Sequence, residues 1–464
     1  MQRILAIAWL TWKAALRFRL FLVIAVLLVL AVVGLPLVIK DDGTAQGFTQ
    51  IILTYTLSAI TALLGLSTLW LSCGTLARDI EECQIQVVAT KPIARWQIWI
   101  GKWLGIVALN AALLAISGSC VYGLLQWRAT KLPAAEQQIL REQVLVARGV
   151  AKEKSFDAEI DAEAARIFQE RTNSSPELAP SAYLPEVQKQ IREQVKAELQ
   201  VVPAGYSSRP WQIDLGFEKN DLQGKPLQLR VKFNSANHSS SGTFVLAWQV
   251  GDPNSQNIWQ SQPMSLAPDT VHEFQIPPDL FDTNGVLTIV AANPGGTALL
   301  FPLEDGMEVL YPEGGFAMNF VRGLGIIFCW MALLAALGLA AASCLSFPVA
   351  AFFSLAMLGV ILSGGTLADA VESGTVVGGN EETGVMGHSA ADAVLIPFFK
   401  GILSVVRLVE NFSPIDSLST GRAITWGELG LAFGQIVLLL GGIIALAGIG
   451  LFQRRELATA QGTQ

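Results

Sequence analysis

Charged side chains gather in one short stretch between two long apolar blocks, from Gly74 to Gly105. Its pattern predicts the end of one helix, a turn at Thr90-Lys91-Pro92, and a second helix rich in tryptophan. Proline suits the first turn of a helix because its missing N–H would have no partner there. A short polar helical elbow between two spans has a shape that suits a push from a cytoplasmic partner. Its charged residues and its proline include Arg78, Asp79, Glu81, Glu82, Lys91, Pro92 and Arg95.

Motifs of common catalytic and metal sites are missing. His272 begins a sequence like the zinc-protease motif, but Ile276 stands where the second histidine belongs. Gly101-Lys102 is no phosphate-binding loop, because Trp103 follows in place of Ser or Thr. The five cysteines contain no CxxC pair. We therefore expect a chain that is not an enzyme, binds no cofactor or metal and hydrolyses no ATP itself.

The elements that position the charged stretch are membrane helices. The chain has 464 residues, 52% hydrophobic and only 15% charged, against about 25% charged in soluble domains. Uncharged blocks long enough to cross a bilayer recur along it. Pro348 divides the longest of them. We expect six spans, at about residues 20–39, 49–72, 103–126, 320–343, 347–365 and 429–451.

Lysine and arginine counts predict the orientation. With the N-terminus inside, the short inner segments hold ten of these residues and the short outer segments four. We therefore expect a multi-pass protein of a bacterial plasma (inner) membrane, with both termini cytoplasmic. Residues 128–315 would then be extracytoplasmic. Residues 1–19 mix Arg and Lys with Trp and Leu, a pattern typical of an interfacial helix.

A large insertion separates the third and fourth spans. Its charge is about −8, which gives no electrostatic reason to bind nucleic acid. In residues 134–200, apolar residues recur every three or four positions, as in Phe156, Ile160, Ala164 and Ile167. With the breaker at Asn173-Ser174-Ser175-Pro176, this pattern predicts a helical hairpin.

From residue 209 the period changes to two, as in Trp211, Ile213, Leu215 and Phe217. Gly, Asn, Asp and Pro clusters separate several such runs, which predicts a β-sandwich that resembles a jelly roll. Trp248 and Trp259 are expected in its core, with sugar stacking as the alternative.

The expected domains follow from these patterns. They are residues 1–126, with three spans and the elbow at 73–102; 127–204, helical; 205–315, the β-sandwich; and 316–464, with three further spans. Within the last, the segment 366–428 is expected to be re-entrant or interfacial, because Val394–Leu408 is too short and too charged to cross. The fold class is thus a polytopic α-helical membrane protein with an extracytoplasmic helical hairpin and β-sandwich.

The charged helix followed by TKPIARWQIWIGKWLG resembles the permease subunits of the type-2 ABC exporter family. The interfacial N-terminal helix and the six spans are similar as well, but the insertion of nearly 190 residues departs from compact members of that family. The resemblance implies that a separate ABC ATPase subunit, carrying ATP and Mg²⁺, docks on the elbow residues named above. It also implies a second permease copy or a homologue.

Two hypotheses for the function follow from the sequence. The first is the membrane subunit of an ATP-driven exporter or force transmitter. The alternative is a non-transporting receptor or assembly factor that binds a ligand through its β-sandwich. Tryptophans 96, 99 and 103 form either a headgroup-level belt or part of the docking face. The residues identify neither the substrate nor the direction of transport.

Overall fold

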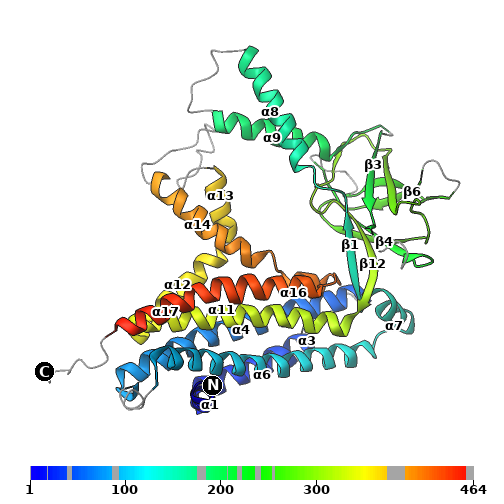
Figure 1. Cartoon of the computed structure of the whole chain (residues 1–464). Coiled ribbons are helices and arrows are strands. Elements are labelled where there is room, and N and C mark those ends of the chain that lie inside the picture. Colours follow the sequence, from blue (N-terminus) through cyan, green and yellow to red (C-terminus); the bar gives the residue numbers. More distant parts are fainter. Residues whose placement is uncertain are drawn as a thin grey trace. The chain divides into compact units, whose positions relative to one another are not determined.

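The computed structural model describes residues 2–17, 19–38, 44–85, 93–174, 184–205, 207–216, 222–235, 242–252, 257–373 and 392–455. Within the chain, contacts define two compact units. The helical unit comprises Met1–Ala147 and Gly314–Gln464, and the β unit comprises Arg148–Glu313. Figure 1 shows the helices and strands of both.

In the part that the structure describes, the helical unit consists mainly of α-helix, with short π-helical stretches (η). Its elements are α1 (Gln2–Arg17), α2 (Arg19–Val29), η1 (Leu30–Gly34), α3 (Leu35–Val38), α4 (Ala45–Glu81), α6 (Arg95–Ala129), α7 (Ala134–Ile139), η2 (Leu140–Val144), α11 (Phe316–Cys344), α12 (Phe347–Leu362), α13 (Gly364–Ser373), α14 (Asp392–Glu410), α15 (Pro414–Ser419), α16 (Trp426–Ala432), η5 (Phe433–Gly441) and α17 (Gly442–Arg454).

Four helices in the described part of the chain are long and apolar enough to cross a membrane. They are α4, α6, α11 and the continuous Trp426–Arg454 formed by α16, η5 and α17. The helical membrane class is therefore confirmed. The first and fifth expected spans fall on shorter apolar helices, Val23–Val38 and Phe347–Ile361. The count of six spans stays a prediction.

The division of the longest apolar block lies where proline predicted it. Helix α11 ends at Cys344, and α12 begins at Phe347 with Pro348 in its first turn. Proline at that place leaves no backbone donor unsatisfied, whereas inside a helix it would remove a hydrogen bond. The break therefore creates a helix N-terminus at Phe347, close to the end of α4.

Beyond α12, the chain forms α13, α14 and α15. Helix α14 covers the stretch expected to lie at the outer interface and packs against α13. It leaves Val394, Phe398 and Val405 exposed. An interfacial position for it stays a prediction.

The β unit contains short antiparallel strands, as the period-two runs predicted. They are β1 (Val146–Lys152), β2 (Val201–Val202), β3 (Ser207–Asp214), β4 (Leu227–Lys232), β5 (Asn234–Ser235), β6 (Phe244–Gly251), β7 (Ile258–Gln260), β8 (Met264–Leu266), β9 (Val271–Ile276), β10 (Val286–Asn293), β11 (Leu299–Leu300) and β12 (Met307–Gly315). One sheet has the order β1-β12-β4-β9, a second β3-β10-β6-β7 with β8 on β6, and a small third β2-β11-β5.

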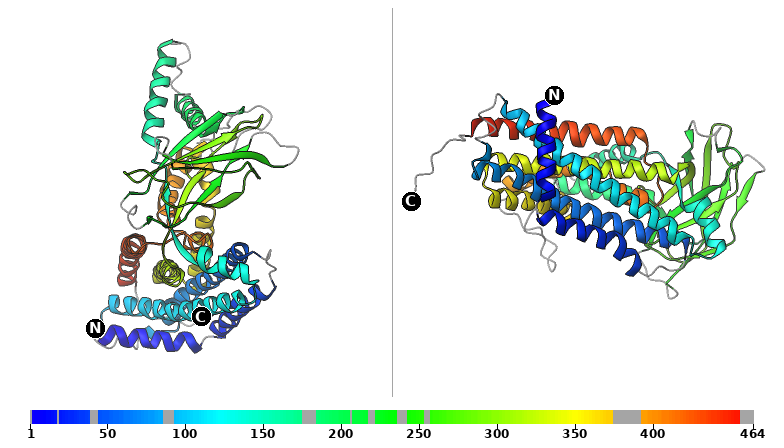
Figure 2. Two further views of the ribbon diagram at one scale, coloured as in Figure 1. Left: turned by 90° about the vertical axis from the view of Figure 1, so that its right-hand side faces the viewer. Right: turned by 90° about the horizontal axis from the view of Figure 1, so that it is seen from below.

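The two larger sheets share one apolar core, to which alternate residues of their strands contribute. Strand β10 lies between β3 and β6, with Ile289 opposite Trp211 and Val250. Trp248 is 1% exposed at the centre of this core. Figure 2, left, shows these sheets one above the other. Trp248 therefore serves core packing, and a sugar-stacking role for it is wrong.

One element of the insertion differs from the prediction. A helical pattern was expected throughout 134–200, but residues 146–152 form strand β1 at the edge of the four-stranded sheet. The alternation in Val146–Lys152 is too short to stand out beside helical neighbours, and pairing with β12 decides its conformation. Strand β2 likewise lies before residue 205. Two strands of the sheets, β1 and β2, therefore come from residues 127–204, which were expected to be helical. Phe217 lies outside the described residues.

The rest of that segment forms two helices, α8 (Asp157–Ser174) and α9 (Leu184–Gln200). They pack together through Ile160, Ala164, Ile191 and Val195. These residues belong to the apolar series whose spacing predicted the hairpin. The β unit thus contains a helical pair beside its sheets.

Candidate functional site at the turn between α4 and α6

The charged stretch of the sequence lies where α4 ends and α6 begins. Helix α4 runs to Glu81, and α6 starts at Arg95 after an extended Ala94. The Oε1 atom of Gln97 accepts a hydrogen bond from the backbone N–H of Ala94 at 3.3 Å, which satisfies one donor at this helix start. Lys91 and Pro92 lie outside the described residues. We call residues 78–102 the turn region.

An ion pair joins the two helices of the turn region. The Nζ atom of Lys102 lies 2.5 Å from Oδ2 of Asp79 and 2.7 Å from the carbonyl oxygen of Thr75. The side chain of Lys102 is 8% exposed, whereas that of Asp79 is 33% exposed. A buried ammonium needs such partners, since leaving it unpaired is costly. The pair therefore fixes α6 against the last turns of α4.

A second set of contacts attaches the start of α12 to one face of α4. The Arg78 guanidinium lies 4.4 Å from the ring centroid of Phe347, and the Trp70 ring meets that ring edge-on at 5.2 Å. A Cβ added at Gly74 would lie 3.5 Å from the same ring. The carboxylate of Glu81 accepts a hydrogen bond from the backbone N–H of Phe347 at 2.8 Å. We call the four α4 residues that surround this ring and N–H, Trp70, Gly74, Arg78 and Glu81, the Phe347 socket.

The socket follows from helical spacing and from the α12 terminus. Positions 70, 74, 78 and 81 follow one another at three or four residues and so share one face of α4. A carboxylate at a helix N-terminus satisfies an unpaired N–H and interacts favourably with the helix dipole. The proline break that creates this terminus and the acidic end of α4 therefore fit together.

Two arginines bind the C-terminal ends of other helices. Arg95 donates through Nη1 to the carbonyl oxygens of Phe452, Gln453 and Arg455, at 3.0, 2.7 and 2.8 Å. Arg455 in turn donates to the carbonyl oxygens of residues 342, 343 and 345 at the end of α11, at 3.2 to 3.4 Å. Cations are favourable there because the last carbonyls of a helix lack partners and carry the negative end of its dipole.

Helix α1 packs across the start of α6, as Figure 2, right, shows. A Cβ at Gly105 would lie 2.7 Å from the carbonyl oxygen of Ala8, and one at Gly101 would lie 2.8 Å from Cβ of Ile7. Both glycines are thus required by the close approach of the α1 backbone. Glycine at 101 and lysine at 102 therefore have separate roles, one in packing and one in pairing.

The predicted contact residues have different surroundings in the structure. Arg78, Asp79, Glu81 and Arg95 all contact other helices of the chain, and Glu82 accepts a hydrogen bond from the nearby Gln84 side chain at 2.7 Å. Glu81 and Glu82 are exposed. Their role in binding a partner stays a prediction.

The tryptophans of α6 separate into different environments. Trp99 is 1% exposed within the helical core, and Trp103 donates from Nε1 to the carbonyl oxygen of Ala332 at 3.0 Å. Trp96 is 41% exposed. The sequence hypotheses of a headgroup belt or a docking face are therefore wrong for Trp99, which helix packing buries, while Trp96 remains accessible.

Residues missed by the sequence reasoning are Lys102, Phe347, Arg455 and Gly105. Burial and the pairing with Asp79 give Lys102 a structural role, which the comparison with a phosphate-binding loop did not indicate. Phe347 and Arg455 lie far along the chain from the turn region. A local sequence pattern cannot indicate partners this distant in the chain. Pro348 and the pair Arg454-Arg455 mark only the helix ends at which they lie.

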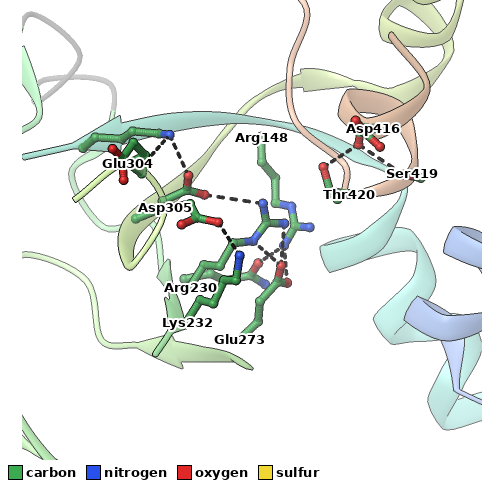
Figure 3. A network of polar contacts seen from close by, with 12 residues as sticks. Arg148, Arg230, Lys232, Glu273, Glu304, Asp305, Asp416, Ser419 and Thr420 are labelled. Atoms are coloured by element: carbon green, nitrogen blue, oxygen red, sulfur yellow. Dashed lines mark hydrogen bonds and ion pairs between the residues drawn. The ribbon is translucent and has the colours of Figure 1, made fainter. Parts of the chain in front are cut away.

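The β unit holds a separate ion-pair network on the four-stranded sheet, shown in Figure 3. Glu273 pairs with Arg148 at 2.9 Å and with Arg230 at 2.5 Å, and Glu308 pairs with Lys152 at 2.9 Å and with Arg230 at 3.5 Å. Burial alone would raise the pKa of the Glu273 carboxyl, but the two guanidinium groups outweigh it and hold that pKa below its ordinary value of 4.5.

The same network explains the sequence that began like a zinc-protease motif. Its glutamate, Glu273, is held by two arginines, and His272 Nε2 lies 2.8 Å from the carbonyl oxygen of Ala267. Among the described residues, no three His, Cys, Asp or Glu side chains gather as a metal site would require. The network joins β1, β12, β4 and β9, the four strands of one sheet, so its role is to hold these strands together.

Comparison with known proteins adds one positive finding. Residues 5–152 match the model of the ABC-2 family transporter proteins. The matched part includes α1, α4, the turn region and α6, and the match confirms the resemblance to permeases of that family. No curated protein and no solved structure gave a match.

Proposed function

Since the match supports an ABC-2 family permease, we propose that this chain is the membrane subunit of an ATP-driven exporter or force transmitter. A separate ABC ATPase, which carries ATP and Mg²⁺, docks on the turn region. The observation that carries this proposal is the convergence of five helices there. Asp79, Glu81 and Arg95 of this region bind groups of α6, α12 and α17, and Arg455, whose carbonyl Arg95 binds, in turn binds the end of α11.

Such a junction suits the reception of force. A partner that pushes on the turn displaces the ends of several helices at once, because charged hydrogen bonds link them. Hydrogen bonds to charged groups contribute about 1.5–3 kcal/mol each. A turn held only by its own two helices would instead bend without moving the bundle.

The proposal includes an orientation and an assembly. The turn region and both termini lie in the cytoplasm of a bacterium, in accord with the basic residues near them. The β unit lies on the outer side. Two permease chains, identical or homologous, pair with two ATPases. The matched family works as a membrane component of transport, so the chain itself hydrolyses no ATP.

Glu82 offers the sharpest test of docking. It is exposed, and its carboxylate accepts a hydrogen bond from the side chain of Gln84, two residues away. Glu81 is a poorer probe, because Glu81→Lys would also remove the acceptor of the Phe347 N–H. A double reversal at both positions would therefore confuse an effect on docking with an effect on folding.

The experiment purifies the tagged full chain from its native cells and measures how much ATPase accompanies it. We expect an ABC ATPase with the wild type and at least about tenfold less with Glu82→Lys, since like charges at a docking surface cost several kcal/mol. Glu159→Lys on the exposed face of α8 is the matched control and should bind as wild type.

Two results would contradict the proposal in different ways. Absence of any ATPase from the wild-type preparation would favour the receptor or assembly-factor alternative, with the β unit as the binding module. Full binding by Glu82→Lys would show that this end of α4 is a solvated surface and would remove Glu82 from the docking site.

A further inference from the structure

Arg95 and Arg455 act on helix ends in sequence, one after the other. Arg95 stands at the first position of α6, directly after the turn, and its guanidinium binds three carbonyl oxygens at the end of α17. One of these carbonyls belongs to Arg455 itself. The side chain of Arg455 then binds three carbonyls at the end of α11.

The geometry of guanidinium suits this task. In each arginine the terminal nitrogen Nη1 reaches all three carbonyls, which at a helix end otherwise depend on water. Because Arg455 lies in the segment that Arg95 holds, the position of the second guanidinium depends on the first. Releasing Arg95 frees the backbone that carries Arg455.

Close packing one turn away makes the three helices move together. A Cβ at Gly448 of α17 would lie 3.0 Å from the Cα of Ala340 in α11 and 3.2 Å from Nε1 of Trp99 in α6. The glycine therefore lets α17 approach both other helices closely. Interiors packed at this density transmit displacement and do not absorb it.

We propose that Arg95 and Arg455 form a two-step relay that transmits displacement of the turn region first to α17 and then to α11. The relay deepens the proposed function, on which its role in transport rests, by naming the residues through which an ATPase-driven push spreads. Arg95 is therefore a positioning residue within the chain, whereas the family resemblance implied a place for it in the partner interface.

The relay predicts an effect at a distance, which hydrogen–deuterium exchange can measure. The sample is the purified full chain in lipid nanodiscs without any ATPase, and the readouts are peptides covering residues 446–455 and 336–345. Arg95→Met should accelerate exchange at both helix ends by about tenfold, the loss expected of one hydrogen bond to a charged group. Arg95 touches only the first of these ends.

Two further variants define the order of the relay. Arg455→Met should accelerate exchange at the end of α11 and leave residues 446–451 unchanged. Arg454→Met is the matched control, because Arg454 is exposed and lies on the same last turn of α17. It removes an equal charge and should change neither end. If Arg95→Met is not recovered folded, Arg95→Lys should give the same two-site pattern at smaller amplitude.

If Arg95→Met accelerated exchange only at the end of α17, the relay would be overturned, and Arg95 would stabilise that helix end alone. An equal effect of Arg454→Met would assign the change to general charge loss and would overturn it as well. Neither result depends on ATPase binding, so failure of the relay leaves the docking proposal intact. Conversely, if no ATPase bound the chain, the exchange experiment would still test the relay, because it uses the chain alone.

Discussion

The pair of Asp79 and Lys102 gives the most specific prediction for the turn region, because its partners differ in burial. Asp79→Ala leaves the ammonium of Lys102, 8% exposed, with the Thr75 carbonyl. Removing one partner of a buried pair costs about 3–5 kcal/mol. We therefore expect the free energy of unfolding to fall by about 3 kcal/mol, the lower end, because the remaining carbonyl still accepts a hydrogen bond.

Lys102→Met should cost less. It leaves the Asp79 carboxylate, which is 33% exposed and can be hydrated. A loss of about 1–2 kcal/mol is expected, within the range for one unsatisfied polar group. The double variant removes both charges, so its loss should fall short of the sum of the single losses. The shortfall, the coupling energy, should be about 2 kcal/mol, within the range for contacting residues.

The assay is unfolding of the purified chain in mixed detergent micelles, followed by circular dichroism. Lys13→Met on α1 serves as control, because Lys13 is exposed and lies 5.2 Å from the Trp9 ring centroid. It should cost less than about 1 kcal/mol. Equal losses for the two single variants, with a double variant that equals their sum, would refute the pair as a link between α4 and α6.

Three other predictions address the topology and the β unit. With the remaining cysteines replaced, an impermeant thiol reagent should label Gln262→Cys in intact cells and label Cys83 only in inverted vesicles; the reverse would refute the orientation. Residues 146–313 expressed alone should give a β-rich circular dichroism spectrum, whereas 205–312 should unfold more readily because it lacks β1 and β2; equal stability would refute the importance of those strands. The depressed pKa of Glu273 means that its ion pairs stabilise the fold above about pH 4.5, and this stabilisation is lost as the pH falls through the folded value. Thermal unfolding of the 146–313 unit should show Glu273→Gln less stable at pH 7 by a margin that shrinks below pH 4.5; a constant margin would contradict this.

Much of the fold could be predicted because apolar patterning is local. Uncharged blocks predicted the long helices α4, α6, α11 and Trp426–Arg454, and Pro348 predicted the start of α12. Alternation predicted the central strands of the β unit. Strand β1 was missed because its conformation depends on pairing with β12, far along the chain.

The candidate site could be located from the sequence, but its contacts could not. A charged stretch between two apolar blocks marked the turn region, and the family resemblance singled out the same residues. The resemblance implied an outside partner for most charges of the turn region, and no local rule in the sequence indicates partners inside the chain. Arg95 binds carbonyls more than 350 residues away, and Glu81 binds the N–H of Phe347.

By itself, then, the sequence determined the membrane class, the main apolar helices, the alternating strands and the place of the charged turn. These follow from transfer of side chains out of water, which depends on residue type and period. Only the tertiary structure decided which charge meets which helix end. Helix packing places residues distant in sequence side by side, and Gly101, Gly105 and Gly448 permit the close approaches that set this arrangement. Whether a charge is buried and paired, as in Lys102, or exposed, as in Glu82, follows from that packing.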